Sequence, residues 1–470
     1  MESDDYKFMR IVDAMASLNQ RINLAGVVAE IGIPKNTRGS DAFRSVKIVD
    51  ASEPSNGYFL HFFAESMDKL PHVENIGDVI TVYNVLIKTW DQGSYAQYNK
   101  KYSSFAIFEG RDNSNVEPRP YQFSYTYRAT NQHKKIIREL RKWWAQHNVD
   151  IANGCFAFKD MKEGESVDLL CKILHVSKIE DAAMFFLWDG SDTPPASVES
   201  KLEDERDNPL PLQLEPSLLP RDILCTFPCV GTILRMFLDE RSDKLGVGFL
   251  SSNRWVKLLH VKCEIRAALW CAVLMPFSKF VYLPDDTECV IQCQRSYDMR
   301  LKSKWGRMPI SSATGLSRIT ETDHPNVPFV TLMNVLTHPE VTYKFKCVVR
   351  VVAIFPWRAD DFRAANGIYR VRLTLEDPTA RIHAYIYAED GAKLFGNFTS
   401  VEALTKMRNM LLGVADDSAD TETNGPRNPP WIQCCLKSYY IDSNNVWGSR
   451  NFRIFGTKMV SGFSMPQLPL

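Results

Sequence analysis

The stretch Arg44-Ser-Val-Lys-Ile-Val-Asp50 decides the fold that this sequence predicts. Its apolar and polar residues alternate, which is typical of a half-buried β-strand, and the run stops at an aspartate. Two later stretches, Met184-Phe-Phe-Leu-Trp-Asp-Gly190 and Tyr369-Arg-Val-Arg-Leu-Thr-Leu-Glu-Asp377, end in the same way. Each follows an apolar strand and precedes another strand, so one β motif recurs three times along the chain.

Further strands are expected around each of these stretches. In the first block they are residues 24–28, 58–63, 77–87 and 104–108, with a short helix near 67–70. In the second block they are residues 167–174, 223–236, 255–263 and 288–294, and in the third 343–352, 381–387 and 431–441. Five short strands with such a hairpin match a Greek-key barrel of the OB type. We therefore expect a mainly β fold of three tandem OB-fold Greek-key β-barrels with short connecting helices. Three unrelated β-rich domains are the alternative.

Polar and proline-containing segments divide the chain. The expected boundaries are a first OB domain at 1–128, a linker helix at 129–150, a second OB domain at 151–320 and a third at 321–470. Within the linker, residues 131–147 read as a helix with a basic face. That face comprises Lys134, Lys135, Arg138, Arg141 and Lys142. It is either solvated or in contact with phosphates.

Composition constrains how the chain could bind nucleic acid. Its 470 residues include 56 Lys and Arg and 56 Asp and Glu, so the formal net charge is zero. A domain that depends on bulk attraction to phosphates usually has a pI above about 9. Binding here would instead depend on local grooves and on stacking.

The expected compartment is intracellular. Several of the eleven cysteines lie in apolar, strand-like runs, which indicates reduced thiols rather than a disulfide framework. The first residues are acidic, without an apolar signal core, and no run reaches the roughly 18 apolar residues of a membrane span. We expect a soluble protein with no membrane contact.

No enzymatic signature is present in the sequence. It lacks the phosphate-cradling loop, the HExxH zinc helix and the GxSxG elbow, so we expect no catalysis and no cofactor. Two cysteine pairs, Cys225/Cys229 and Cys289/Cys293, could suggest zinc. Both fall in predicted strands, which favours buried strand cysteines over a metal site.

Aromatic and basic residues interleave in the first block, as in proteins that stack bases and follow phosphates. The candidate rings are Phe43, Phe63, Trp90, Tyr95 and Tyr98, and the candidate cations are Lys35, Arg38, Arg44, Lys47, Lys88 and Lys100. Residues 35–38 and 90–101 would form the two loops that flank an OB binding face. The alternative is that the rings belong to the core and the lysines are solvated.

A second mixed cluster lies near residues 295–307. Tyr297 and Arg300 are its candidate DNA contacts. A solvated loop is the alternative.

Several segments resemble the protection-of-telomeres proteins of plants, a family of telomere-end-binding OB-fold proteins. They are Gly26-Val-Val28, residues 45–50, Phe63, Asn75-Ile-Gly-Asp-Val-Ile80, Ser103-Ser-Phe-Ala-Ile-Phe-Glu-Gly110, residues 167–171 and 186–191, and residues 322–333. No single motif is diagnostic, but their order and spacing together are specific.

The resemblance implies binding of single-stranded G-rich telomeric DNA, of the TTTAGGG type, across the first two OB domains. Such a protein would protect the chromosome 3′ overhang, regulate telomerase access and reside in the nucleus at the telomeric region of chromosomes. The third domain would contact partners, among which the telomerase ribonucleoprotein, the CST complex and a shelterin-type partner are expected.

The resemblance also suggests residue roles. Phe63 is expected to be a base platform, Trp90 to supply an aromatic ring at the end of the fourth strand, and Lys35, Arg38 and Arg44 to contact DNA. The third block is too short for the metal-binding insertion of animal relatives. The alternative function is a telomerase-associated regulatory protein with weak or lost DNA binding.

Overall fold

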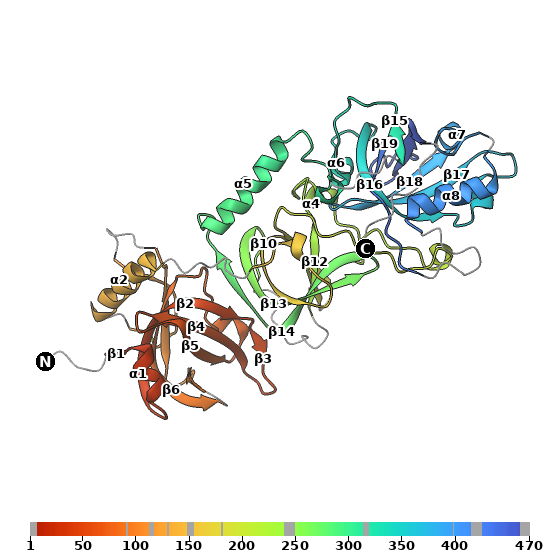
Figure 1. The fold of residues 1–470 in the computed structure, drawn as a ribbon. Coiled ribbons are helices and arrows are strands. Elements are labelled where there is room, and N and C mark those ends of the chain that lie inside the picture. The colour runs from red at the N-terminus through yellow and green to blue at the C-terminus, as the bar shows by residue number, and fades with distance from the viewer. Residues whose placement is uncertain are drawn as a thin grey trace, which may run out of the picture.

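The structure, a computed structural model, describes residues 7–90, 93–111, 117–128, 131–147, 155–179, 182–238, 250–313, 319–397, 399–414 and 425–460. The side chains of Trp90, Asn131, Gln132, Lys178, Ile179 and Ala182 lie outside this description. Three groups of strands follow one another along the chain, from the red end of Figure 1 to the blue end. Among the described residues, no helix combines the length and the apolar character needed to cross a membrane.

The first group is a closed circuit of five strands. In spatial order they are β2 (Arg21–Gly32), β4 (Ala42–Asp50), β5 (Glu53–Ala64), β7 (Gly93–Gln97) and β6 (Val79–Trp90), and β6 pairs back to β2. Strand β8 (Ser104–Phe108) also pairs with β6, so β8 pairs with the first part of β6 and β7 with its last part. Smaller elements surround this barrel: β1 (Phe8–Met9), α1 (Ile11–Ala16), β3 (Lys35–Asn36), the 3-10 helix η2 (Met67–Lys69), β9 (Pro120–Phe123) and α2 (Asn131–Gln146).

The second and third groups repeat the circuit. The second contains, in spatial order, β10 (Ser166–Ile179), β11 (Ala182–Trp188), β12 (Leu234–Leu238), β14 (Leu269–Leu283) and β13 (Arg254–Arg266). The third contains β16 (Lys344–Phe355), β17 (Arg370–Glu376), β18 (Arg381–Tyr387), β20 (Arg450–Phe455) and β19 (Ile432–Tyr440). In all three, the third and fifth strands in chain order pair in parallel, namely β5 with β7, β12 with β14 and β18 with β20, and the other pairs are antiparallel.

The expected fold class is confirmed, because the chain is mainly β and contains closed five-stranded barrels of the OB type. That all three circuits are OB barrels stays a prediction, which their shared strand order supports.

The recurring aspartate holds the same turn in each circuit. Asp50 accepts hydrogen bonds from the backbone of Ser52 and Glu53 and from Ile11 at the start of α1. Asp189 accepts from Ser191 and Phe158, and Asp377 accepts from Thr379, Ala380 and Leu332. Each carboxylate therefore closes the hairpin after the second strand and also holds the segment that precedes the first strand. Its acceptor-only chemistry suits buried backbone N–H groups that need partners.

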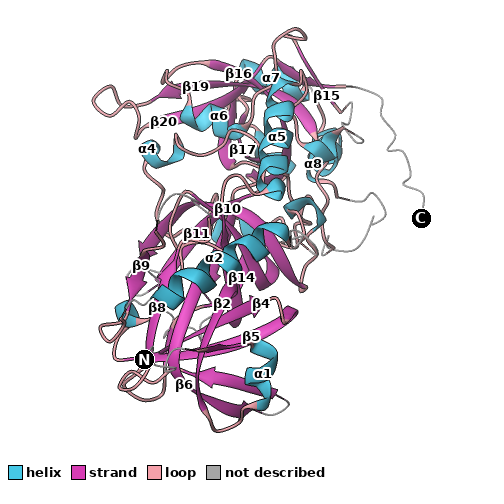
Figure 2. Cartoon of the chain, turned by 90° about the vertical axis from the view of Figure 1, so that its left-hand side faces the viewer, coloured by secondary structure: helices cyan, strands magenta, loops and turns pink. Residues whose placement is uncertain are grey.

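Helices cover the outer faces of the barrels (Figure 2). Ile137 and Leu140 of α2 pack on Val27, Val79 and Phe108 of the first barrel. Helix α5 (Glu288–Lys302) packs Cys289 and Val290 on Trp188, Phe186 and Trp255 of the second barrel. The remaining elements are η3 (Phe158–Asp160), α3 (Asp204–Asp207), α4 (Arg221–Leu224), η6 (Ile310–Ser312), β15 (Thr320–Thr322), α6 (Leu332–Thr337), η7 (Ala359–Phe362), α7 (Glu389–Phe395), α8 (Val401–Leu412) and β21 (Thr457–Met459).

Four local expectations were wrong. Residues 288–294 form the start of helix α5, not a strand, and residues 223–233 contain helix α4 and a loop before β12. Residues 93–97 form a strand of the barrel instead of part of a loop. Arg141 is buried in α2 and donates to the carbonyl of Glu109, so it does not belong to the solvated basic face. In each case tertiary packing overrides the local pattern.

The barrels are joined through their sheets. Lys279 and Phe280 of β14 pair with Gly32 and Ile31 of β2, which makes one continuous 14-stranded sheet of the first two circuits. Between the second and third circuits, the segment 194–215 docks on the third barrel. There Arg381 donates to the carbonyl of Pro211, and Arg350 donates to that of Ala196. Arg381 also donates to the carbonyl of Ala268, in the turn between β13 and β14.

Candidate nucleic-acid interface

Strands β4 and β5 of the first barrel present one face outward. Their period of two places Val46, Ile48, Leu60 and Phe62 in the barrel core. The alternate residues are therefore directed away from the core. On β4 these are Phe43, Ser45 and Lys47, and on β5 they are Phe59, His61 and Phe63.

Four of the outward side chains form a continuous row of rings, called here the aromatic row: Phe63, Phe43, His61 and Tyr95. The ring centroids of Phe63 and Phe43 lie 5.1 Å apart, and those of Phe43 and His61 lie 5.2 Å apart. His61 lies 4.3 Å from Tyr95, which β7 supplies. All four side chains are half-buried, so each keeps some ring surface exposed to solvent. The row can therefore offer flat surfaces to unstacked bases.

His61 contributes a neutral ring. Burial, together with the nearby Lys35 charge, lowers the pKa of His61 to about 4. The imidazole is therefore uncharged near neutral pH, and it acts in the row through its surface and not through a positive charge.

Cations lie at both ends of this face. Lys35 places its Nζ 5.4 Å from the centroid of the Phe43 ring. At the other end, Phe59 lies under the Nζ atoms of Lys47 (5.8 Å) and Lys279 (4.9 Å). Arg38 is exposed, and Lys88 lies opposite Tyr95 in the β6–β7 pairing. These positions suit contacts to a sugar-phosphate chain passing over the rings.

Glu30 holds Lys47 and Lys279, the two lysines beside Phe59. Its carboxylate accepts from Lys47 Nζ at 2.9 Å and from Lys279 Nζ at 2.6 Å. Burial disfavours the charged carboxylate, but the two lysines outweigh that effect and hold the pKa of Glu30 below its ordinary value. Two positive charges share one negative charge, so this cluster is net positive.

The same cluster borders a groove between the first and second barrels, called here the junction groove. Its volume is about 310 Å³, and its lining includes Lys47, Lys257, His260 and Lys279. Phe59, two residues from His61 on the outward face of β5, lies near the Nζ atoms of two groove-lining lysines, Lys47 and Lys279. The second barrel therefore contributes cations to the interface through β13 and β14.

Several expected DNA contacts have other roles. Arg44 is buried and donates to the carbonyls of Gly32 (3.1 Å) and Pro71 (2.7 Å), so it holds the barrel instead of facing solvent. Tyr98 is buried against Phe62 and Phe105. Lys100 lies at the surface but pairs with Asp41 at 2.9 Å. The side chain of Trp90 lies outside the described residues.

The two candidates of the second block are also structural. Arg300 makes a bidentate ion pair with Asp192, at 2.7 and 2.8 Å, and Asp192 also accepts from the backbone of Ile310. Tyr297 packs against the edge of the buried Trp188, at a centroid distance of 4.9 Å. Both side chains hold α5 on the second barrel, and that they also contact DNA stays a prediction.

The cysteine pairs also differ from their predicted setting. Cys289 and Cys293 lie in helix α5, while Cys225 and Cys229 lie at the end of α4 and in the loop that follows. Within the part of the chain that the structure describes, no group of three or more His, Cys, Asp or Glu side chains is arranged to hold a metal ion.

Sequence reasoning missed two contributors to this surface, His61 and Lys279. His61 could have been found from the alternation in β5, because Tyr58, Leu60 and Phe62 face inward. Lys279 had no local signal, since it reaches the first barrel through a strand pairing 247 residues away in sequence, between Lys279 and Gly32.

Strand order and outward aromatic face together define a class of β-barrel proteins that use an OB-type surface for binding. The comparisons specify the family. The model for telomeric single-stranded DNA-binding POT1/CDC13 proteins matches residues 2–153, and the model for the POT1A-like OB-fold domain matches residues 315–445.

Two curated relatives match almost end to end. Protection of telomeres protein 1b of Arabidopsis thaliana is 38% identical over 458 residues, which cover 97% of this chain and 98% of the relative. Protection of telomeres protein 1a of the same plant is 36% identical over 473 residues, with 97% and 98% coverage. A solved structure of fission yeast Pot1 with single-stranded DNA covers 64% of this chain and 95% of its own, at 11% identity and a TM-score of 0.26. The chain belongs to the protection-of-telomeres family.

Proposed function

We propose that this chain binds single-stranded G-rich telomeric DNA through the outward face of its first barrel. The observation that carries the proposal is the aromatic row, in which four half-buried rings on neighbouring strands keep centroid distances of 4.3 to 5.2 Å. The family model named for telomeric single-stranded DNA binding matches the residues that build this barrel and α2. Both Arabidopsis relatives carry protection of telomeres in their names.

The interface has two parts, one that would stack bases and one that would contact phosphates. The aromatic row would stack bases, each worth about 1–3 kcal/mol. Lys35, Arg38 and Lys88 would contact phosphates beside the row, and the Lys47–Lys279 cluster would carry the strand into the junction groove. Phe63 and Phe43 lie opposite each other in the β4–β5 register, so they form a paired stacking surface at one end of the row.

A protein with this activity would protect the chromosome 3′ overhang, limit telomerase access and act in the nucleus at telomeric chromatin. A shelterin-type partner, the CST complex and the telomerase ribonucleoprotein are the partners that the family suggests. The proposed division has OB domains at 1–128, 151–320 and 321–470 with a linker helix at 129–150, in which the first two domains bind DNA and the third contacts partners. Within the first two domains, we assign the DNA to the first barrel and to its junction with the second.

The test compares equal-length strands of the telomeric G-rich sequence, its complement and a scrambled sequence at fixed salt. We expect the G-rich strand to bind most tightly, and Phe63→Ala to weaken it about 5- to 150-fold. Phe123→Ala is the matched control, because Phe123 lies on β9 of the same barrel, is 57% exposed and belongs to no part of the row. Equal affinity for all three strands would reject the proposal.

One observation favours a second candidate, a telomerase-associated regulatory role with weak DNA binding. Several cations that could face a phosphate chain are engaged with protein groups instead, namely Arg44, Lys47, Lys100 and Arg300. Pure protein that ignores all three strands but co-purifies with telomerase would favour this role over the first.

A further inference from the structure

The third barrel presents an outward face of mixed aromatic and basic character. On β17 and β18, Val371, Leu373, Ile382, Ala384 and Ile386 are buried in the barrel core. The alternate positions therefore lie outside the core. They are Arg370 and Arg372 on β17 and His383, Tyr385 and Tyr387 on β18.

The strand register brings these side chains together. Arg372 lies opposite Tyr385, and Arg370 lies opposite Tyr387. Tyr385 also lies beside Arg453 of β20. Tyr385 is 37% exposed and Tyr387 is 46% exposed, so both rings are open to solvent while their backbone is fixed in the barrel.

Positive charge exceeds negative charge on this face. Arg453 Nε donates to Asp390 at 2.7 Å, and Lys437 Nζ lies 3.6 Å from the same carboxylate. Arg372 pairs with Glu205 of the segment that docks from the second barrel, at 2.7 Å. Arg370 is exposed and adds a further positive charge. The guanidinium of Arg453 also lies 5.5 Å from the centroid of the Tyr387 ring.

The face occupies the same strands as the aromatic row of the first barrel. Phe43 lies on the second strand of its circuit, His61 and Phe63 on the third and Tyr95 on the fifth. In the third barrel these strands are β17, β18 and β20, which carry Arg370, Tyr385, Tyr387 and Arg453. Both faces combine exposed rings with neighbouring cations, although rings predominate in the first and cations in the third.

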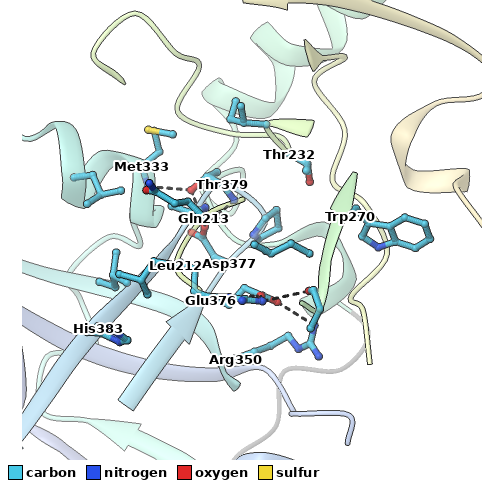
Figure 3. A pocket seen from close by; sticks show the side chains of 18 of the residues that line it. Leu212, Gln213, Thr232, Trp270, Met333, Arg350, Glu376, Asp377, Thr379 and His383 are labelled. Carbon is cyan, nitrogen blue, oxygen red and sulfur yellow. Dashed lines mark hydrogen bonds and ion pairs between the residues drawn. The ribbon is translucent and has the colours of Figure 1, made fainter. Parts of the chain in front are cut away.

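A pocket continues this face toward the second barrel. His383 and Tyr385 line it together with Leu212 and Trp270, and its volume is about 360 Å³. Figure 3 shows His383 and Trp270 on opposite sides of the pocket. Its lining combines apolar residues with charged ones such as Arg350, Glu376 and Arg381, and a cavity of this size is large enough to receive an unstacked base.

We propose that the outward face of the third barrel is a second binding site for single-stranded nucleic acid, in which Tyr385 and Tyr387 stack bases and Arg370 and Arg453 contact phosphates. The site goes beyond the first-barrel function, because it would let a longer strand engage the chain at both ends. An acidic protein segment could satisfy the cations, but it would not require the flat tyrosine surfaces.

The experiment uses the full chain with G-rich strands of two lengths, one of about ten nucleotides and one of about thirty, since one OB fold covers about 4–16 nucleotides. The variants are the double change Tyr385→Ala with Tyr387→Ala, and the conservative double change to Phe. The matched control is Tyr125→Ala, which removes a fully exposed tyrosine of the first barrel outside both faces.

We expect the double alanine variant to bind the long strand at least about fivefold more weakly, while its affinity for the short strand stays unchanged. The double phenylalanine variant should bind like the original chain, because it keeps both rings and removes only the hydroxyl groups. Arg370→Ala should reduce the magnitude of the salt slope for the long strand by about 0.7. A photoreactive base in the long strand should crosslink to the peptide that contains β18.

The outcomes separate this site from the first one. In a chain with Phe43→Ala and Phe63→Ala, failure to lose short-strand affinity would count against the first-barrel proposal alone. Unchanged long-strand affinity in the double alanine variant, without a β18 crosslink, would overturn the third-barrel site. If the double alanine variant no longer binds an acidic protein but keeps its long-strand affinity, the third-barrel site is also overturned, in favour of a protein-binding face.

Discussion

Glu30→Gln should strengthen DNA binding instead of weakening it. Glu30 is the carboxylate that Lys47 and Lys279 share, at 2.9 and 2.6 Å. With the carboxylate present the cluster carries a net charge of about +1, and the substitution raises it to about +2 while keeping a side chain of the same shape. The freed lysines can then face phosphates.

The size of the effect follows from simple electrostatics. One additional unit charge about 6 Å from a phosphate contributes about 0.7 kcal/mol in water, or roughly a threefold gain in affinity. One further phosphate contact also steepens the plot of log affinity against log salt by about 0.7 for a single strand. The change in slope is the sharper measure, because it reports charge directly.

The assay is fluorescence anisotropy with a short G-rich strand at several salt concentrations between about 0.05 and 0.2 M. The matched control is Glu264→Gln on β13, which also removes a carboxylate held between two cations, Lys262 and Arg266, both at 2.9 Å. Glu264 does not line the junction groove, so its loss should leave the slope unchanged. Equal slopes for the original chain and Glu30→Gln would show that the strand does not pass this cluster.

Three further predictions test other parts of the structure. His61→Phe should preserve affinity for the G-rich strand and His61→Ala should lower it about fivefold or more, because His61 acts as a neutral ring; a similar loss in both would mean that its nitrogen atoms matter. Arg300→Ala leaves Asp192 buried without its partner and should destabilise the packing of α5 by about 3–5 kcal/mol, seen as faster amide exchange in α5, while short-strand binding stays unchanged. Burial raises the pKa of Asp377 to about 6, above its value in the unfolded chain, so its contribution to stability is present below about pH 4 and is lost as the pH rises through about 6. Relative to Asp377→Asn, the third barrel should therefore lose about 3 kcal/mol of stability between pH 3 and 7, measured by amide exchange at Leu332, and parallel pH profiles would contradict this.

The barrels could be predicted from sequence because their strands carry strong local signals. These signals depend only on neighbouring residues. They are the alternation in residues 44–50 and 369–375 and the aspartate after each second strand, and the structure places all of them as expected. The helix at 288–302 was missed because its first residues, Cys289, Val290 and Ile291, form an apolar, partly β-branched run that resembles a short strand. Strand β14 was missed because polar and aromatic residues interrupt its apolar run.

The candidate site was only partly predictable. Phe43, Phe63 and Tyr95 could be proposed from composition, and alternation decides which side of the sheet each occupies. Arg44 and Lys47 show the limit of such reasoning. Both are cations on β4, yet Arg44 faces carbonyl groups inside the barrel and Lys47 faces outward, a difference that one position in register determines.

The pairing of β14 with β2 has a mechanical consequence. Since backbone hydrogen bonds at Lys279 and Phe280 fuse the first two barrels into one sheet, a nucleotide chain crossing from the rings to the junction groove would meet a preorganised track without an intervening hinge. The two barrels would then lose little orientational freedom on binding. A modest positive charge and a few rings can therefore suffice for binding, whereas two barrels joined by a flexible linker would need a larger contact area.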